Sequence, residues 1–438
     1  MATGYNCGLY WRGWLFKKSS FFGIWHRCFC ELQFNEFYIR KNNFSLQPVQ
    51  TIILDKTVKI ELINHRKYVG FSICLNSDFL LFKSNNEEEI LQWVVALKSS
   101  ICNCSSSISI TNFKAISVIG RGFFGKVSLY QEKKTKNLFA IKSIHKAPLM
   151  MDHHTDIILG EINIMKGLYH SPFVVDLKFA FQSATKFYIG MEYLPGGDLL
   201  TLLSNTPNLL TMFDIKLILA QLCLALHHLH MQNLIYRDLK PENVLFRNDG
   251  YVKLIDFGLA KILEPDNQTT STFCGTPEFV APEMVKREKY TYSVDWWSFG
   301  ILAYEMLYKK TPFFDENLNK IYGRILTSSV TYPLNADPTA VSFIEMLLAK
   351  NPERRGGYEE IISHEFFNEI DFEKVMKREY KPDFVPTLDR PTDTRYFDRM
   401  FTSERAYDSF ASPVFGCSAM FADFNFDGIS TPSEMIMQ

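Results

Sequence analysis

A glycine-rich segment between two apolar, strand-like stretches is the first feature that could do chemistry. Its residues are Ile119-Gly120-Arg121-Gly122-Phe123-Phe124-Gly125-Lys126-Val127. Three glycines at this spacing also occur in dinucleotide sites, but there a helix follows the glycines directly. Here Phe139-Ala140-Ile141-Lys142 indicates another strand instead. Two strands joined by a glycine hairpin can fold over the phosphates of ATP, because the backbone amides of the hairpin face the anions.

Lys142 is then expected to reach the α- and β-phosphates of the nucleotide. An ammonium group in this position needs a carboxylate to hold it, and Glu161 lies on a helix predicted over residues 156–168. Taken alone, these two side chains would be interpreted more simply as a solvated lysine and glutamate on the surface. The decision therefore depends on the motifs that follow.

Three further motifs follow in order along the chain. They are Tyr236-Arg237-Asp238-Leu239-Lys240-Pro241-Glu242-Asn243, Asp256-Phe257-Gly258 and Ala281-Pro282-Glu283. Together with the glycine loop and Lys142, they have the order and approximate spacing of eukaryotic protein kinases. Residues 113–369 therefore resemble a two-lobed protein kinase domain of the α+β class. Tyr236 at the usual histidine position, with Thr272-Phe273-Cys274-Gly275-Thr276-Pro277-Glu278-Phe279, resembles the AGC group of Ser/Thr protein kinases.

The resemblance implies a role for each charged residue in phosphoryl transfer, which requires charge neutralisation and a hydroxyl in line with the γ-phosphorus. Asp256 and Asn243 would hold Mg²⁺. Asp238 would accept or orient the proton of the substrate hydroxyl, and Lys240 would contact the γ-phosphate. Because no required charged group is missing, an active enzyme is favoured over a lipid-tethered scaffold whose kinase fold only binds partners.

The same resemblance implies which residues brace and line the nucleotide site. Thr276 would bond to Asp238 and Lys240, and Glu283 would pair with Arg355. The adenine pocket is expected to be apolar, with backbone bonds from the segment that joins the lobes and an aromatic side chain from the C-terminal tail. Its members would be Ile119, Val127, Ala140, Met191, Glu192, Leu194, Leu245 and Phe401.

Protein substrates and an upstream activating kinase are the partners that this resemblance implies. Four carboxylates, Asp198, Glu242, Glu278 and Glu305, would form an acidic groove for peptides with Arg before the phosphoacceptor. Thr272 and Ser412 are the expected phosphorylation sites, and phosphorylation of Thr272 would activate the enzyme.

The first hundred residues predict β-structure closed by one helix. Residues 58–62 and 71–75 alternate between apolar and polar side chains, as strands do. Gly13-Trp14-Leu15-Phe16-Lys17-Lys18 and Trp25-His26-Arg27-Cys28-Phe29 resemble the first two strands of a pleckstrin-homology β-barrel with its C-terminal helix, here assigned to residues 5–103. Lys17, Lys18 and Arg27 would form a basic pocket for a phosphoinositide head group. The alternative is a domain of this fold that binds a protein.

A serine-rich linker is predicted at residues 104–112 and a C-terminal tail at residues 370–438. This order of parts is similar to that of the protein kinase B family. Phe421-Ala422-Asp423-Phe424-Asn425-Phe426 resembles the hydrophobic motif of such tails, with Asn425 at the usual phosphorylation site. We therefore expect Phe421 and Phe424 to dock on the small lobe without a phosphate.

An EF-hand loop is a competing interpretation of the same stretch. The matching residues are Asp423, Asn425, Asp427, Gly428 and Glu434. Pro432 stands where the exiting helix should begin, and the sequence contains no partner hand. Calcium binding is therefore the less favoured interpretation.

Composition limits the remaining classes of function. With 47 Lys and Arg against 48 Asp and Glu, the formal net charge is −1, so generic nucleic-acid binding is not expected. No run of about 18 apolar residues is apparent that could span a bilayer. The sequence predicts a cytoplasmic monomer that reaches the plasma membrane reversibly through phosphoinositides.

Overall fold

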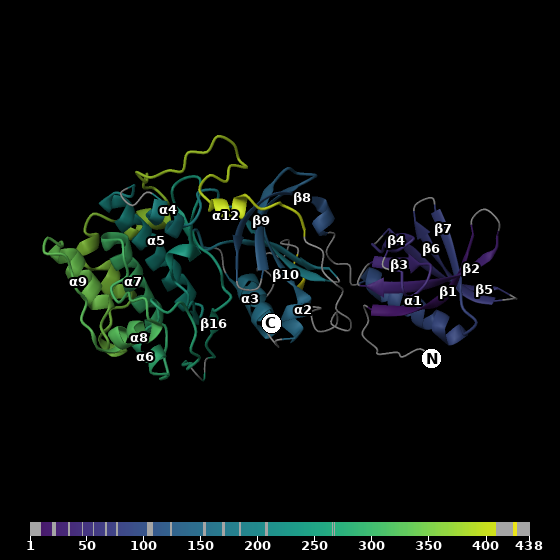
Figure 1. The fold of residues 1–438 in the computed structure, drawn as a ribbon, viewed down its shortest axis with the longest axis horizontal. Coiled ribbons are helices and arrows are strands. Elements are labelled where there is room, and N and C mark those ends of the chain that lie inside the picture. Colours follow the sequence, from purple (N-terminus) through teal and green to yellow (C-terminus); the bar gives the residue numbers. More distant parts are fainter. Residues whose placement is uncertain are drawn as a thin grey trace.

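The computed structural model describes most of the chain as three bodies. Figure 1 shows them along the long axis as an N-terminal sheet, a small lobe and a large lobe. The described residues are 10–19, 23–33, 36–45, 47–55, 57–65, 68–75, 78–102, 108–122, 125–151, 155–168, 171–183, 185–205, 209–264, 266, 268–408 and 424–426. Several residues named above lie outside them, namely Phe123, Phe124, Ser412, Phe421, Asp423, Asp427, Gly428, Pro432 and Glu434.

The N-terminal body is a seven-stranded antiparallel sheet closed by one helix, as predicted. Its strands are β1 (Tyr10–Lys18), β2 (Trp25–Gln33), β3 (Glu36–Arg40), β4 (Gln50–Ile53), β5 (Lys59–His65), β6 (Tyr68–Leu75) and β7 (Asp78–Lys83), in the order β4-β3-β2-β1-β7-β6-β5. Helix α1 (Glu87–Cys102) buries Ile90, Trp93, Val94 and Leu97 against this sheet. These side chains repeat with the helical period, so one face of α1 closes the core.

The small lobe is a five-stranded antiparallel sheet with two helices. Its strands are β8 (Phe113–Arg121), β9 (Gly125–Glu132), β10 (Leu138–His145), β11 (Leu177–Gln182) and β12 (Lys186–Glu192), in the order β11-β12-β10-β9-β8. Helices α2 (Lys146–Met151) and α3 (Thr155–Gly167) follow β10. The glycine segment is therefore the turn between β8 and β9, as the sequence predicts. An added Cβ at Gly125 would lie 2.3 Å from the carbonyl oxygen of Ser143, so only glycine fits this crossing of β9 and β10.

The large lobe is mainly helical and also contains two short two-stranded sheets. Its helices are α4 (Leu199–Asn205), α5 (Met212–His230), α6 (Pro282–Val285), α7 (Ser293–Tyr308), α8 (Leu318–Thr327), α9 (Pro338–Leu347), α10 (Tyr358–Ile362) and α11 (Phe372–Met376). The strand pairs are β13 (Leu234–Ile235) with β16 (Lys261–Ile262), and β14 (Val244–Phe246) with β15 (Val252–Leu254). Together with the N-terminal sheet, the two lobes confirm the predicted α+β class.

Helix α5 is unusually apolar. Among the described residues, it is the one helix that is long and apolar enough, by length and composition alone, to cross a membrane. However, 72% of its apolar window is buried in the protein, where α5 packs against β15, α7 and α11. Its apolar surface is therefore accounted for by the core of the large lobe.

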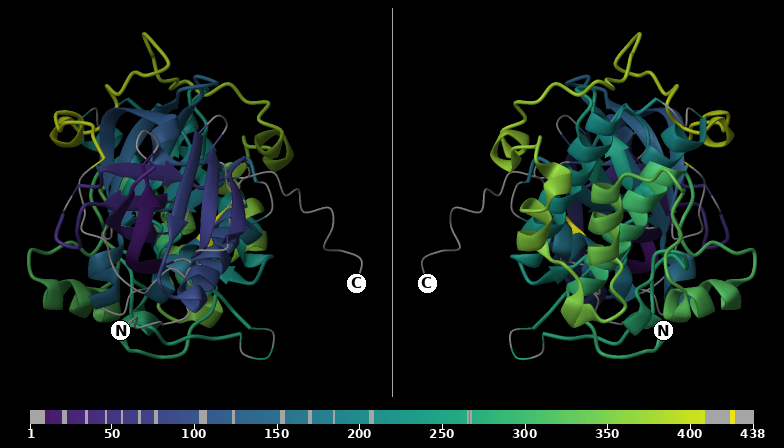
Figure 2. Two further views of the ribbon diagram at one scale, coloured as in Figure 1. Left: turned by 90° about the vertical axis from the view of Figure 1, so that its right-hand side faces the viewer. Right: turned by 90° about the vertical axis from the view of Figure 1, so that its left-hand side faces the viewer.

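The segment after the large lobe returns to the small lobe. In both views of Figure 2, its yellow-green chain arches over the top of the molecule. Helix α12 (Arg399–Thr402) contacts β8, the first strand of the glycine hairpin. The tail is thus laid over the lobes that form the candidate site.

Candidate active site

A buried ion pair joins the small-lobe sheet to helix α3. Lys142 Nζ on β10 lies 2.6 Å from Glu161 Oε1 and 3.5 Å from Asp256 Oδ1. Burial lowers the pKa of Lys142, but the carboxylates of Glu161 and Asp256 raise it more, so the net shift is upward. The ammonium group therefore stays charged, as the binding of phosphate oxygens requires.

A second constellation forms on the loop between β13 and β14. Lys240 Nζ lies 2.9 Å from Asp238 Oδ2 and 3.0 Å from the Thr276 hydroxyl, which donates to Asp238 Oδ1 at 3.1 Å. Asn243 Nδ2 donates to Asp238 Oδ2 at 2.9 Å. The bonds that the resemblance implied for Thr276 are confirmed, and Asp238 is held from three sides.

Sequence analysis did not single out Asp295, whose carboxylate binds the backbone of this loop at Tyr236 and Arg237. Asp295 is fully buried on α7 and accepts bonds from the backbone N–H groups of Tyr236 (2.9 Å) and Arg237 (2.7 Å). Its carboxylate also lies 2.8 Å from His230 Nε2. Arg237 has a φ of 69°, a conformation that is uncommon outside glycine and needs such support. An Asp in the first turn of an apolar helix was the only available signal.

Asn243 and Asp256 provide oxygen atoms of the kind that Mg²⁺ prefers. The backbone N–H of Ile255, beside Asp256, donates to the carbonyl oxygen of Asn243 at 2.9 Å, which ties the two positions together. Burial raises the pKa of Asp256, but Lys142 and the Gly258 N–H outweigh this effect, so the net shift is downward. Asp256 is therefore ionised, and the donor set fits the metal.

Three of the predicted adenine-pocket residues, all on the small-lobe sheet, pack with one tail aromatic. Ile119, Ala140 and Val127 pack in one cluster with Phe397. Leu194 is buried, and Leu245 lies on β14. Phe397 is the tail aromatic in this cluster, whereas the predicted Phe401 lies half-buried on α12. The ring of Phe397 stacks on Tyr193 at 6.0 Å, directly after Glu192.

The tail also contacts both sides of the glycine hairpin. Arg121 forms a two-point ion pair with Glu404 at 2.8–3.1 Å, and Lys126 Nζ donates to the carbonyl oxygen of Tyr407 at 3.1 Å. Asp408 accepts bonds from the buried Lys186 (2.6 Å) and from the Tyr188 hydroxyl (2.8 Å) on β12. The cations of the predicted nucleotide loop are thus engaged by the tail.

All four predicted groove carboxylates take part in mutual repulsion, since Glu242 and Glu278 act on Glu305 and Asp198 acts on Glu242. Burial, followed by the charges of Glu242 and Glu278, raises the pKa of Glu305 to about 7. Glu305 Oε2 is buried and lacks a hydrogen-bond partner among the described residues. Asp198 instead accepts bonds from the backbone N–H (2.7 Å) and hydroxyl (2.9 Å) of Thr201 at the start of α4. An acceptor that lacks a donor suits a guanidinium ligand.

Thr272 lies exposed near the catalytic loop. Arg237 Nη1 donates to the Tyr290 hydroxyl at 3.1 Å, and that hydroxyl donates to the carbonyl oxygen of Thr272 at 2.6 Å.

A buried ion pair joins α6 to the segment before α10. Arg355 binds both carboxylate oxygens of Glu283 at 2.7 and 2.9 Å, with both side chains buried. The pairing of Glu283 with Arg355 is therefore confirmed.

The three predicted lipid-binding cations do not share one face of the N-terminal sheet. Lys17 lies on the same side of β1 as the buried Leu15, and its ammonium donates to Gln50 Oε1 at 2.6 Å. Lys18 and the exposed Arg27 lie on the other side, where the Arg27 guanidinium covers the Trp14 ring at 4.5 Å. Successive residues of a strand point to opposite faces, so Lys17 leaves the sheet on a different side from Lys18 and Arg27. The shared pocket for a head group stays a prediction.

The described end of the tail returns to the edge of the small-lobe sheet. Phe424 is fully buried, with its ring 4.5 Å from that of Phe187. Ala180 and Phe426 exchange two backbone hydrogen bonds of 2.8 Å, so the segment extends the sheet beside β11. The predicted docking of Phe424 on the small lobe is confirmed, and Phe421 lies outside the described residues. That this docking needs no phosphate stays a prediction.

Comparisons with known proteins agree with this geometry. The protein kinase domain model matches residues 113–367, and the PH domain model matches residues 9–101. The RAC family serine/threonine-protein kinase homolog of Dictyostelium discoideum is 34% identical over 405 residues, which is 90% of each chain. Serine/threonine-protein kinase gad8 of Schizosaccharomyces pombe is 40% identical over 310 residues, or 70% of this chain and 54% of that protein. Ribosomal protein S6 kinase alpha-3 of Homo sapiens is 40% identical over 333 residues, or 74% and 45%. The chain thus spans about half the length of the last two relatives.

Proposed function

The chain belongs to the protein kinase family, in its AGC group, and from this premise we propose that it transfers the γ-phosphate of ATP to serine or threonine hydroxyls of proteins. The observation that carries the proposal is the constellation around Asp238. Lys240, Thr276 and Asn243 all bond to this one carboxylate, which leaves it oriented beside the nucleotide site.

Each side chain has a distinct task in this proposal. Lys142, held by Glu161, binds the α- and β-phosphate oxygens. Asp238 accepts or orients the proton of the attacking hydroxyl, and Lys240 moves from its present bond to Asp238 toward the γ-phosphate. Mg²⁺ held by Asn243 and Asp256 would offset the charge of the triphosphate when bound.

Peptides with Arg before the phosphoacceptor are the proposed substrates. Glu242, Glu278 and Glu305 offer concentrated negative charge, and burial together with the charges of the other two raises the pKa of Glu305, which a bound cation would oppose. A guanidinium supplies such a charge in a planar form that carboxylates bind well. We propose in addition that an upstream kinase activates the enzyme at Thr272.

Recruitment is proposed to occur through the N-terminal domain. Its PH fold supports reversible binding to phosphoinositides, which would bring a cytoplasmic, monomeric kinase to the plasma membrane. The half-buried Lys18 and the exposed Arg27 on one face are the proposed contacts, with Lys17 on the opposite face.

The test is transfer of labelled γ-phosphate from ATP to an Arg-containing peptide library, with the full chain and its Asp238→Asn variant. Loss of a catalytic base typically slows a reaction about 10²–10⁴-fold. We expect a loss of this size while the Kd for ATP stays unchanged, because Asp238 acts on the hydroxyl. Near-normal turnover in the variant would remove Asp238 from the mechanism. Absence of transfer by the unaltered, phosphorylated chain would favour the scaffold.

A further inference from the structure

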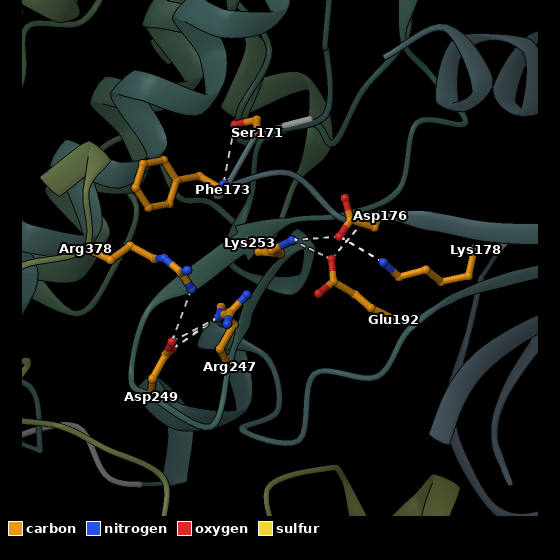
Figure 3. Close-up of polar contacts among 9 residues, drawn as sticks. All are labelled: Ser171, Phe173, Asp176, Lys178, Glu192, Arg247, Asp249, Lys253 and Arg378. Carbon is orange, nitrogen blue, oxygen red and sulfur yellow. Dashed lines mark hydrogen bonds and ion pairs between the residues drawn. The ribbon is translucent and has the colours of Figure 1, made fainter. Parts of the chain in front are cut away.

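A group of charged side chains around one buried lysine lies beside the segment that joins the two lobes. We call it the hinge network, and its members are Asp176, Lys178, Glu192 and Lys253. Figure 3 shows the Lys253 ammonium pointing between the carboxylates of Asp176 and Glu192. The mechanism above uses none of these side chains, although Glu192 is the last residue of β12 and begins the connection.

The contacts of the network join segments of both lobes. Lys253 Nζ lies 2.5 Å from Glu192 Oε1 and 3.5 Å from Asp176 Oδ2. Glu192 Oε1 also accepts a bond of 2.8 Å from the backbone N–H of Asp176. In return, the backbone N–H of Glu192 donates to the carbonyl oxygen of Asp176 at 3.2 Å. Glu192 is therefore fixed by both its side chain and its backbone.

Lys253 connects this point to the floor of the predicted adenine pocket. It lies on β15 directly opposite Leu245 on β14, so the two side chains share one face of the hairpin. The adjacent Leu254 accepts a backbone bond from Val175 (3.0 Å) and donates one to Phe173 (2.8 Å). One cation thus links the floor of the pocket to the first residue of the hinge.

Burial makes this cation hard to replace. Lys253 is 2% exposed, and its removal would take away the cation that lies 2.5 Å from Glu192, whereas Asp176 would keep Lys178 at 3.2 Å. Breaking a buried pair by removing one partner is far more disruptive than breaking an exposed one. A neighbouring exposed pair offers a contrast, since Arg378 lies 3.6 Å from Asp249 with both side chains about two-fifths exposed.

We propose that Lys253 is a positioning residue for ATP, and that it acts by fixing the hinge backbone at Glu192 relative to the pocket floor at Leu245. The proposal rests on the proposed use of ATP. Its effect is exerted on nucleotide affinity and not on the chemical step, because Lys253 contacts neither the phosphates nor Asp238 in this arrangement of β14 and β15.

The experiment measures the Kd and KM for ATP, kcat and the melting temperature of the full chain. We expect Lys253→Gln to raise the Kd and KM for ATP about tenfold with kcat changed by less than about threefold, since small shifts of positioning groups are costly. Lys253→Arg should restore the Kd to within about threefold, because it returns the charge. The matched control Arg378→Gln should stay within about twofold, as an exposed pair contributes little.

A second variant keeps the proposal testable if Lys253→Gln does not fold. Glu192→Gln removes the charge but keeps an acceptor for the Asp176 N–H, and it should raise the Kd for ATP in the same way. An unchanged Kd in the folded variants, or a loss of kcat with unchanged KM, would overturn the proposal. If the unaltered chain binds ATP but transfers no phosphate, the proposed function fails while this inference is still decided by the Kd values.

Discussion

The cleft between the lobes and the first two strands of the N-terminal sheet organise their charges in opposite ways. In the cleft, side chains far apart in sequence bond to one another, such as Lys142 to Glu161 and Asp256. In the sheet, Lys17 and Arg27 are close in sequence but lie on opposite faces. Proximity along the chain therefore does not predict a shared site.

The difference follows from the signs of the charges. Opposite charges attract, so each member of the cleft constellation restricts where the others can be, and a buried arrangement must satisfy all of them together. Cations alone repel, so the charges of Lys17, Lys18 and Arg27 do not draw these side chains into one place. Strand alternation decides their faces instead, and it is insensitive to their charge.

The largest effect outside the catalytic base is expected at Thr272, because the guanidinium of Arg237 has no carboxylate partner among the described residues and bonds to Leu259 and Tyr290 instead. A phosphate there would form charge-assisted bonds with the guanidinium, so Thr272→Ala should lower activity about tenfold or more. Activity of protein purified from eukaryotic cells is the measurement, and Ser271→Ala at the exposed neighbouring position is the control. Full activity of the Thr272→Ala protein would show that the cleft is complete without a phosphate.

The next prediction concerns an apolar contact, and it tests whether burial of one ring contributes to stability and activity as the ion pairs of the cleft do. Phe424 is fully buried against Phe187, and burial of a phenyl ring contributes about 1.5–3 kcal/mol. Phe424→Ala should therefore lower both the melting temperature and kinase activity, measured by calorimetry and peptide phosphorylation.

Calcium provides the control for the tail, because the EF-hand interpretation covers the same residues. Added calcium should change neither the melting temperature nor the activity of the unaltered chain. If truncation before Phe421 leaves both quantities unchanged, or if calcium alone stabilises the protein, the docking interpretation is wrong and the EF-hand gains support.

The sequence predicts the fold and the bonded cleft residues because kinase motifs fix residue types that satisfy one another. It does not predict which tail aromatic reaches Ile119, since Phe397 is placed by the path of the whole tail, including Tyr193 and Glu404. It also misses the face of Arg27, because a one-residue change in strand pairing moves every side chain to the other face. Buried carboxylates such as Asp295 leave too weak a pattern to be singled out.

A smaller effect concerns the acidic groove, where several carboxylates lie near one another. Since the pKa of Glu305 is raised to about 7, this carboxyl is mostly protonated at lower pH and ionised at higher pH. The KM for an Arg-containing peptide should fall by up to about tenfold as the pH rises through 7, because only the ionised form pairs with guanidinium. A Glu305→Gln enzyme should lack this dependence, and an equal fall of KM in that variant would assign the titration to another group.

The smallest effect is expected in the N-terminal domain. There, the loss of vesicle binding in single cation variants identifies the face of the sheet that contacts the membrane. Each cation near an anionic surface contributes about 1 kcal/mol, so Arg27→Ala should weaken vesicle binding about fivefold. Lys17 already donates to Gln50, and burial lowers its pKa, although the nearby Cys28 and Cys30 oppose this shift. Lys17→Ala should therefore weaken binding less than Arg27→Ala does.

Co-sedimentation with phosphoinositide vesicles at two salt concentrations separates these cases, because salt screens contacts between exposed charges. Loss of binding at high salt, with Arg27→Ala as the more affected variant, would assign the lipid to the face that carries Lys18 and Trp14. A larger effect of Lys17→Ala would move the lipid to the Gln50 side, where opposite strands bring His26 beside Lys17. Equal binding to neutral vesicles would instead favour a protein partner, since an uncharged surface offers these cations no counter-charge.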